Sequence, residues 1–364
     1  MADNNELSGR VTMLNMALRT FAAGAFAFCL GILAHQSANA ADVVRVGEGP
    51  FITGGGFYVA NERGYFKKMG LEIQVKKFND GALAVPAILA GELDITLMTA
   101  NASFFNSVAK GAPLVIVLDR GHNRPGYGYL AVNVTQELYD QGVRSLADFA
   151  KLKGKKMGVG AVGSINQYDT ARALQKAGLD PRKDVTWIVG VSQPDLMKML
   201  GQKQVDLTDL AYQFGYFAQN NKWGPIVANG DQIEPNSSIG VYAANKNFVR
   251  DKRDVLVRFA MAYLQGVKEF DAAAKAPDAN QEILEILARN TFLNKPELIK
   301  AIAPYWSYTS EDGIPPIDSI MAMQDYWADY FTYVEKKATR EQLFDLSVAQ
   351  EAKKRLDAEA PFKK

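Results

Sequence analysis

The sequence predicts an α/β protein of two lobes, each built on a mainly parallel sheet with flanking helices and joined by a two-segment hinge. From Val43 onwards, short β-rich runs alternate with helical stretches, which is the pattern of parallel sheets. Residues 93–116 also align without a gap with residues 205–228, at a constant offset of 112 (205 − 93 = 112). Solenoid repeats are only about 20–50 residues long. The repeat therefore predicts two lobes of similar topology.

The first forty residues differ in kind from the rest. Arg10 and Arg19 precede an apolar run over residues 21–33, and Ala38-Asn39-Ala40 follows it. The run is shorter than the roughly 20 apolar residues that span a bilayer, and Ala-x-Ala is a signal-peptide cleavage pattern. We therefore expect residues 1–40 to be a secretory signal peptide, cleaved after Ala40. An uncleaved membrane anchor is the alternative.

Composition argues against several classes of function. The formal net charge is +1, without a Lys/Arg run or a long acidic tail, so we expect no nucleic-acid partner. Cys29 is the only cysteine and lies in the predicted signal peptide, which leaves the mature chain without a thiol nucleophile or a disulfide. With His35 removed as well, His122 is the sole histidine, so a multi-histidine metal site is excluded. We expect no metal, no cofactor and no catalytic site.

The expected elements form two series. Strands are expected at residues 43–46, 71–76, 95–98, 114–118, 129–132, 155–159, 185–189, 207–210, 226–228 and 240–244. Helices are expected at residues 57–68, 82–90, 102–110, 166–177, 194–201, 214–221, 249–274, 281–290, 296–304 and 317–337, with a charged, helix-prone tail at 340–364.

Two crossings, at residues 119–127 and 234–238, join the lobes and make a hinge. Residues 41–124 and 240–364 are accordingly assigned to lobe 1, and residues 125–239 to lobe 2. In open parallel sheets, ligands bind outside the carboxyl ends of the strands. The loops at those ends would then face one another across a cleft; they are residues 50–57, 79–81 and 99–103 in lobe 1, and 160–167, 192–195 and 211–214 in lobe 2.

A Gly-rich turn from Gly160 to Gly163 joins the strand expected at residues 155–159 to a helix that opens near Ser164. Free NH groups and the helix dipole make such a turn a seat for an anion or a polar ligand head. Gly158, Gly160 and Gly163 also match the dinucleotide fingerprint, with Asp180 or Asp184 as the ribose-binding acid. A tight turn that binds nothing is the third interpretation.

Several motifs carry a family resemblance. They are VRVG, ANERGYFKKMGLEIQV, ILAGELDIT, LADFAKLKGKKMGVGAVGS, ALQKAGL, FVRDKRDVLVRFAMAYLQG and IPPIDSIMAMQDYW. With them, the chain from Val43 to about Ala352 resembles the SsuA/THI5-like (NMT1-type) periplasmic substrate-binding proteins of ABC transporters, a group that binds taurine, alkanesulfonates, nitrate or pyrimidines. The resemblance implies a type II periplasmic binding protein fold that closes on a ligand and delivers it to ABC permease subunits. It implies a periplasmic protein, and we expect a monomer.

One departure from the family concerns the ligand. After VDLTDL, relatives often carry a Trp and an acidic residue followed by Pro, whereas this chain has Ala211-Tyr212-Gln213-Phe214. The ligand is therefore not carried over from a relative. We expect a small organic anion, a sulfonate or carboxylate with an aromatic or alkyl body.

The expected ligand contacts come from the cleft loops and the first crossing. Backbone NH groups and hydroxyls would hold the acidic group, aromatic rings would cover the body, and guanidinium groups would bond two oxygens at once. For Arg120 and Arg124, solvated hinge charges are the alternative. The candidates are Thr53, Gly55, Phe57, Thr99, Asn101, Ser103, Arg120, His122, Arg124, Gly163, Ser164, Ile165, Asn166, Tyr212, Gln213 and Phe214.

Two other functions compete with solute capture for import. A periplasmic sensory module would close on its ligand in the same way but dock to a receptor. A THI5-type pyrimidine-synthesis enzyme would be cytosolic and would carry a Cys-rich motif, which this chain lacks. We therefore expect a binding protein and not an enzyme.

Overall fold

The computed structural model describes residues 41–78 and 81–362, so the predicted signal peptide lies outside the described residues. The chain from Asp42 onwards forms one compact unit. None of the helices described in it is long and apolar enough to cross a membrane.

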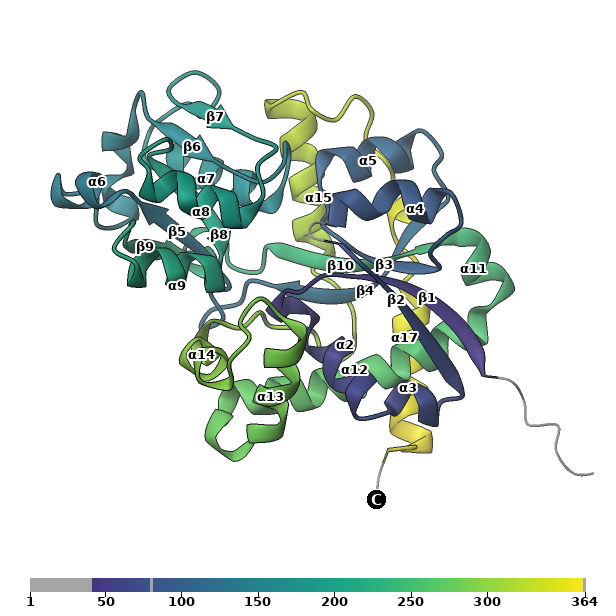
Figure 1. Cartoon of the computed structure of the whole chain (residues 1–364). Helices are drawn as coiled ribbons and strands as arrows, with labels where there is room; N and C mark the ends of the chain where they lie inside the picture. The colour runs from purple at the N-terminus through teal and green to yellow at the C-terminus, as the bar shows by residue number, and fades with distance from the viewer. Residues whose placement is uncertain (1–40, 79–80, 363–364) are drawn as a thin grey trace, which may run out of the picture. The chain divides into compact units, whose positions relative to one another are not determined.

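The first sheet is mixed and belongs to lobe 1 (Figure 1). Its strand order is β2-β1-β3-β10-β4. β1 pairs in parallel with β2 and β3, whereas β10 is antiparallel to both β3 and β4, so only β10 is reversed. The bounds are β1 (Asp42–Glu48), β2 (Leu71–Lys77), β3 (Ile95–Met98), β4 (Leu114–His122) and β10 (Ser238–Asn245).

The second sheet, in the teal part of Figure 1, repeats this arrangement in lobe 2. Its order is β7-β6-β8-β5-β9, with β5 as the reversed strand. The two orders match strand for strand, so the 112-residue repeat is a repeat of topology. The bounds are β5 (Leu130–Val134), β6 (Lys156–Gly158), β7 (Thr186–Ile188), β8 (Leu207–Ala211) and β9 (Ile226–Asn229).

The reversed strands are the two that arrive from the other lobe. Leu130, the first residue of β5, pairs with Ala211, the last residue of β8. Ser238, the first residue of β10, likewise pairs with His122, the last residue of β4. Each crossing strand thus enters its sheet at the edge where the other strands end, and therefore has to run the opposite way. These edges, where parallel strands end, are the expected place for a ligand.

One pair of side chains shows the repeat at atomic detail. Asp94, just before β3, accepts a hydrogen bond through Oδ2 from the backbone NH of Arg45 at 2.8 Å. Asp206, just before β8, accepts one from the backbone NH of Lys156, also at 2.8 Å. Each carboxylate fastens the start of one central strand to its parallel neighbour.

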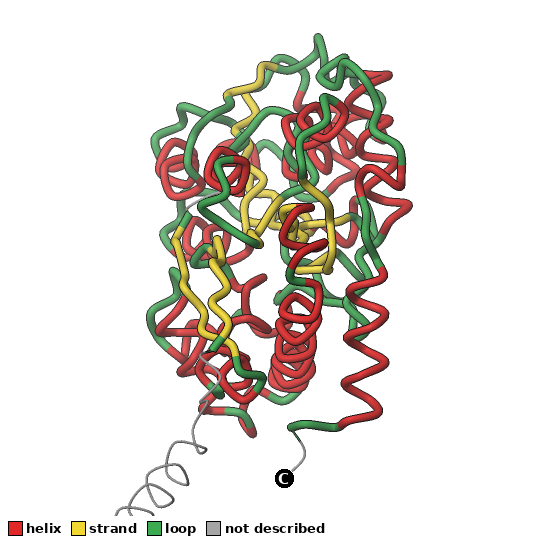
Figure 2. Tube along the Cα trace, turned by 90° about the vertical axis from the view of Figure 1, so that its right-hand side faces the viewer, coloured by secondary structure: helices red, strands yellow, loops and turns green. Residues whose placement is uncertain are grey.

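Helices lie on both sides of the strands, as Figure 2 shows. Those that follow the strands of lobe 1 are α2 (Gly55–Glu62), α3 (Tyr65–Lys68), α4 (Val85–Leu89) and α5 (Ala102–Ala109). Lobe 2 has α6 (Gln136–Asp140), α7 (Ile165–Lys176), α8 (Gln193–Gly201), α9 (Tyr212–Asn220) and α10 (Gly230–Ile233). After β10 come α11 (Lys246–Asp251), α12 (Arg253–Lys275), α13 (Gln281–Asn290), α14 (Pro296–Ala301), α15 (Ile317–Asp325), α16 (Arg340–Leu343) and α17 (Ser347–Glu359).

Three predicted helices are interrupted. The helix expected at residues 57–68 breaks at Gly64, whose φ of 71° is left-handed. The helix expected at residues 249–274 is divided at Lys252 into α11 and α12. The helix expected at residues 317–337 is regular only through Asp325 and ends in a π-helical turn at Tyr330.

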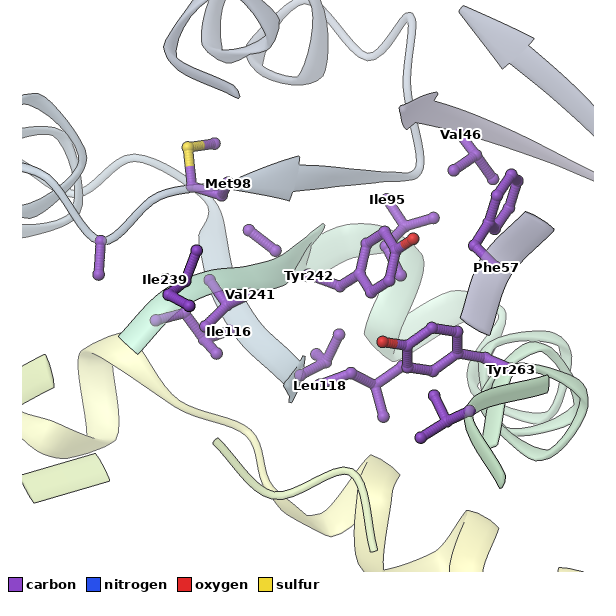
Figure 3. Close-up of a cluster of buried hydrophobic side chains, with 14 of the residues drawn as sticks. Val46, Phe57, Ile95, Met98, Ile116, Leu118, Ile239, Val241, Tyr242 and Tyr263 are labelled. Carbon is purple, nitrogen blue, oxygen red and sulfur yellow. The ribbon is translucent and has the colours of Figure 1, made fainter. Parts of the chain in front are cut away.

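The core of lobe 1 lies between its sheet and α12. α12 packs against α2 and α17. Figure 3 shows Tyr242 of β10 beside Tyr263 of α12; their ring centroids are 5.2 Å apart at an interplanar angle of 88°. This edge-to-face packing fixes the reversed strand against the helix.

Candidate functional site

A cavity lies between the lobes, where the carboxyl ends of the strands meet the two crossings. Its volume is about 60 Å³, which at roughly 10–15 Å³ for each water is room for about four to six waters. Lobe 1 contributes Phe51, Thr53, Gly81, Leu97, Met98, Thr99, Arg120, Ile239 and Gly240 to its lining, and lobe 2 contributes Tyr129, Leu130, Gly160, Ala161, Ser164, Ile165, Asn166 and Gln193. The lining is mostly apolar, with a few hydrogen-bonding groups, as in pockets for small solutes.

Four larger hollows are also lined by the described residues, and the two largest lie away from these strand ends. One, of about 510 Å³, includes Asp42 and Arg45 at the start of β1. Another, of about 820 Å³, lies on the surface around Arg124. Both are more open to solvent than the interlobe cavity. Neither is lined by the helix N-termini that face the smaller cavity.

The N-terminus of α7 supplies the polar wall on the side of lobe 2. Ser164 caps the helix, because its Oγ accepts a hydrogen bond from the backbone NH of Gln167 at 3.3 Å. The NH of Gly163 is already bonded to Gln167 Oε1 at 2.7 Å. Within the described residues, the NH groups of Ile165 and Asn166 have no acceptor, as expected in a first helical turn. These two NH groups and the Ser164 hydroxyl are therefore free for a ligand.

Gly163 itself touches the opposite lobe. Its φ of 68° is left-handed, and a Cβ added to it would lie 2.5 Å from the Cβ of Ala102 on α5. A glycine is required here both for the turn and for the close approach of the lobes.

Arg120 lines the cavity, but its charge is already balanced. Its guanidinium donates to the carboxylate of Glu48 and, through Nη1, to Thr53 Oγ1 at 2.6 Å; all three residues are buried. The hydroxyl of Tyr242 also donates to Glu48. Burial by itself lowers the pKa of Arg120, but the charge and hydrogen bond of Glu48, together with Tyr242 and Tyr58, outweigh burial and raise the pKa. Arg120 is thus half of a buried ion pair.

Two buried carboxyls lie behind the N-terminus of α7. Asn166 Nδ2 donates to the backbone oxygen of Asp209 at 3.1 Å and to its Oδ1 at 3.4 Å. Burial raises the pKa of Asp209 well above its usual value. Burial also raises the pKa of Asp169, and the charges of Asp209 and Glu234 add to the rise.

Asp169 connects α7 to both crossings. Asn123 Nδ2 donates to Asp169 Oδ2 at 3.2 Å, and the hydroxyl of Ser237 donates to Oδ1 at 3.5 Å. The crossings are bonded to each other as well, since the backbone NH of Asn123 donates to Ser237 O at 2.9 Å. A carboxyl of lobe 2 therefore holds the two hinge segments together.

The aromatic residues predicted at the start of α9 lie between the lobes but outside the cavity lining. Tyr212 stacks on Tyr305 with ring centroids 3.8 Å apart, and Phe214 packs against Phe292 at 5.0 Å. Gln213 between them is fully buried, and neither of its amide atoms forms a hydrogen bond within the described part of the chain.

Four lobe 1 candidates do not line the cavity. Phe57 is in the hydrophobic core, because the first turn of α2 directs it inwards. Gly55 lies against Phe270, and Asn101 uses its side chain to cap α5. Ser103 is exposed on the first turn of that helix.

The candidates after Arg120 also lie outside the cavity lining. His122 Nδ1 is 2.9 Å from Asp119 Oδ2, and its ring packs edge-on against Tyr308. Arg124 is exposed, with its guanidinium carbon 4.2 Å from the ring centroid of Tyr308. The interpretation of Arg124 as a cleft residue is wrong, because the crossing leaves the cleft after β4 and this side chain packs on the outer surface.

Eleven residues of the lining were missed as ligand contacts. Five of them lie in the predicted cleft loops, namely Phe51, Gly81, Gly160, Ala161 and Gln193, and the other six lie outside those loops. These six are Leu97, Met98, Tyr129, Leu130, Ile239 and Gly240. The last four stand where a crossing strand enters its sheet. That position was readable from the two predicted crossings. Burial raises the pKa of Tyr129 strongly, and Arg120, Thr53 and Gln213 beside its hydroxyl oppose the rise.

Two repeated five-stranded sheets, each with one strand reversed by a crossing, and a cavity between their strand ends define the periplasmic binding protein fold. Solved structures agree. The alkanesulfonate-binding protein SsuA of Xanthomonas axonopodis pv. citri, bound to MOPS, matches with a TM-score of 0.66 and 18% identity over 83% of this chain and 98% of its own. The nitrate-binding protein NrtA of Synechocystis PCC 6803 matches with a TM-score of 0.71 and 14% identity over 87% of this chain and 90% of its own.

Sequence comparison identifies the family. A model described as NMT1/THI5 like matches residues 53–279, which is more than half of the chain. The protein belongs to this family. A binding protein of Brucella abortus (strain 2308) is 24% identical over 294 residues, covering 75% of this chain and 86% of its own. The relatives and structural neighbours named here are binding proteins rather than enzymes.

Proposed function

We propose that the protein is the extracytoplasmic solute-binding component of an ABC importer, which captures a small organic anion between its lobes and delivers it to the permease. The observation that carries the proposal is the free first turn of α7 facing a cavity between two hinged lobes. A cleft of this kind buries a solute on closure and presents a closed shape to a partner. The names of two structural neighbours, an alkanesulfonate-binding protein and a nitrate-binding protein, support a small anionic solute.

In this proposal the acidic group of the solute accepts hydrogen bonds from the NH groups of Ile165 and Asn166 and from the Ser164 hydroxyl. The dipole of α7 adds to this attraction, because the partial positive charge of a helix lies at its N-terminus. Arg120 and Thr99 reach the cavity from lobe 1. Export removes residues 1–40, and the mature protein works in the periplasm as a monomer.

The proposal can be tested by thermal unfolding of residues 41–364, which are the compact unit from Asp42 onwards and Ala41 before it. The solutes added are sulfonates, aliphatic and aromatic carboxylates, nitrate and pyrimidines. A ligand at about one hundred times its Kd stabilises the folded state by roughly 2.7 kcal/mol, enough to raise the thermal midpoint by several degrees. We expect a shift with at least one class of organic anion. The proposal is abandoned if no solute in the panel raises the midpoint.

Ser164→Ala and Ser192→Ala form a matched pair for this test. Both serines cap a helix through Oγ, Ser164 at α7 and Ser192 at α8, but only Ser164 lines the cavity. Each substitution costs about 1 kcal/mol of stability through the lost cap. Only Ser164→Ala should also weaken the binding of the anion. If the two variants bind the anion equally well, the ligand does not contact the N-terminus of α7.

A further inference from the structure

We propose that the cavity selects a solute whose head group carries a hydrogen-bond donor beside its acceptor oxygens, such as a hydroxycarboxylate. Oxyanions without a donor, such as sulfonates and nitrate, are disfavoured. The inference rests on the proposed function, since it concerns the same cavity, and it starts from the orientation of one side-chain amide.

Asn166 is held with its NH₂ group away from the cavity. Nδ2 donates to two acceptors of Asp209, the backbone oxygen at 3.1 Å and Oδ1 at 3.4 Å. Turning the amide over would set Asn166 Oδ1 against the backbone oxygen of Asp209, acceptor against acceptor, because a backbone carbonyl has no proton to donate. The network of Asp209 therefore fixes the amide, and its oxygen is the group left for a ligand.

The residue that carries this free oxygen lines the cavity. Asn166 is 7% exposed and lines the cavity, and its Oδ1 accepts no hydrogen bond from any residue that the structure describes. The backbone NH of the same residue is free as well. The seat at α7 thus offers two NH donors and, a few atoms away, one carbonyl acceptor. A ligand that fills it needs both an acceptor and a donor.

The charges around the cavity do little to attract an anion of either class, so the hydrogen-bonding groups decide between them. Arg120 is the only Lys or Arg in its described lining, and Glu48 already balances it. Asp209 lies directly behind Asn166. A sulfonate or nitrate has only acceptor oxygens, so it leaves Asn166 Oδ1 unpaired once water is excluded, and such a group keeps its full desolvation cost. A hydroxyl beside a carboxylate removes that cost.

Calorimetric titration with three matched series tests the inference. Each series holds a 2-hydroxy acid, the acid without the hydroxyl and the sulfonate of the same body. They are glycolate, acetate and methanesulfonate; lactate, propionate and ethanesulfonate; and mandelate, phenylacetate and phenylmethanesulfonate. One hydrogen bond contributes about twofold to tenfold in affinity. We expect the hydroxy acid to bind about fivefold more tightly than the other two in every series that binds.

Two variants assign the effect to Asn166. In Asn166→Ala the hydroxy acid should bind about as tightly as the other two members of its series. In Thr99→Ala, which removes a lining hydroxyl from lobe 1, the preference should remain. The wild-type comparison decides the matter even if Asn166→Ala does not fold.

The outcomes separate the two proposals. A deoxy acid or a sulfonate that binds as tightly as its hydroxy partner overturns the inference and leaves solute capture standing. A preference that survives in Asn166→Ala also overturns it. If none of the nine probes binds, capture of a small organic acid fails, and the inference fails with it.

Discussion

Closure of the lobes can be tested at Gly163, because an alanine there meets the opposite lobe. The new Cβ would lie 2.5 Å from Ala102 Cβ, whereas carbon atoms in favourable contact are about 3.5–4.0 Å apart. The lobes would have to separate locally by about 1–1.5 Å. The left-handed φ of 68° adds roughly 1–2 kcal/mol of strain. We expect Gly163→Ala to lower affinity for the captured solute at least tenfold, about 1.4 kcal/mol.

Gly178→Ala is the control for backbone strain. Gly178 also has a left-handed φ, of 84°, but no atom lies within 4 Å of the place its Cβ would take. Both variants should lose similar stability in urea unfolding, and only Gly163→Ala should lose affinity in calorimetry and expand in solution scattering. Adding Ala102→Gly should restore part of the affinity. If Gly163→Ala binds as well as Gly178→Ala, the contact between the lobes does not limit closure.

Three further predictions concern stability. Burial and acidic neighbours raise the pKa of Asp169, so the carboxyl of the folded protein keeps its proton at a pH where the unfolded chain has lost it. The free energy of unfolding should therefore fall as pH rises above about 4. For one proton, the fall is about 1.4 kcal/mol per pH unit. Asp169→Asn should flatten that fall in urea titrations across pH, and an unchanged slope would contradict the assignment. Arg120→Met should cost about 3–5 kcal/mol in chemical denaturation, because it leaves Glu48 buried and uncompensated; adding Glu48→Gln should recover part of this loss, and strictly additive losses would argue against the pair. Asp94→Ala and Asp206→Ala should each cost about 1–3 kcal/mol; a loss at only one position would mean that the repeated bond has unequal roles.

The strands were the most predictable part of the fold. Their cores are short apolar runs bounded by turn residues, and β3 (Ile95–Met98) has the bounds expected from the sequence. Helix interruptions were harder to predict. Gly64 and Lys252 fall inside patterns that remain amphipathic, so the periodicity of apolar residues did not mark either break.

The cleft loops were predictable as segments, but the directions of their side chains were not. Ser164, Ile165 and Asn166 line the cavity because a strand-to-helix turn after a parallel strand always faces that edge. The ion pair of Arg120 could not be foreseen, since its partner Glu48 stands 72 residues earlier in the chain. A sequence shows that a guanidinium is present near the hinge; only the fold shows that its charge is already balanced.

The placement of β10 also sets the order in which the molecule can be assembled. Among the described strands, β4 pairs only with β10, apart from isolated bridges to Tyr308 and Phe344. A chain made from its N-terminus therefore cannot complete the sheet of lobe 1 until Asn245 is available, whereas the strands of lobe 2 are continuous between Leu130 and Asn229. Pairing over such long separations slows folding. Until then, β4 lacks its neighbouring strand and one edge of β3 stays unpaired, while β1, β2 and β3 can already pair with one another.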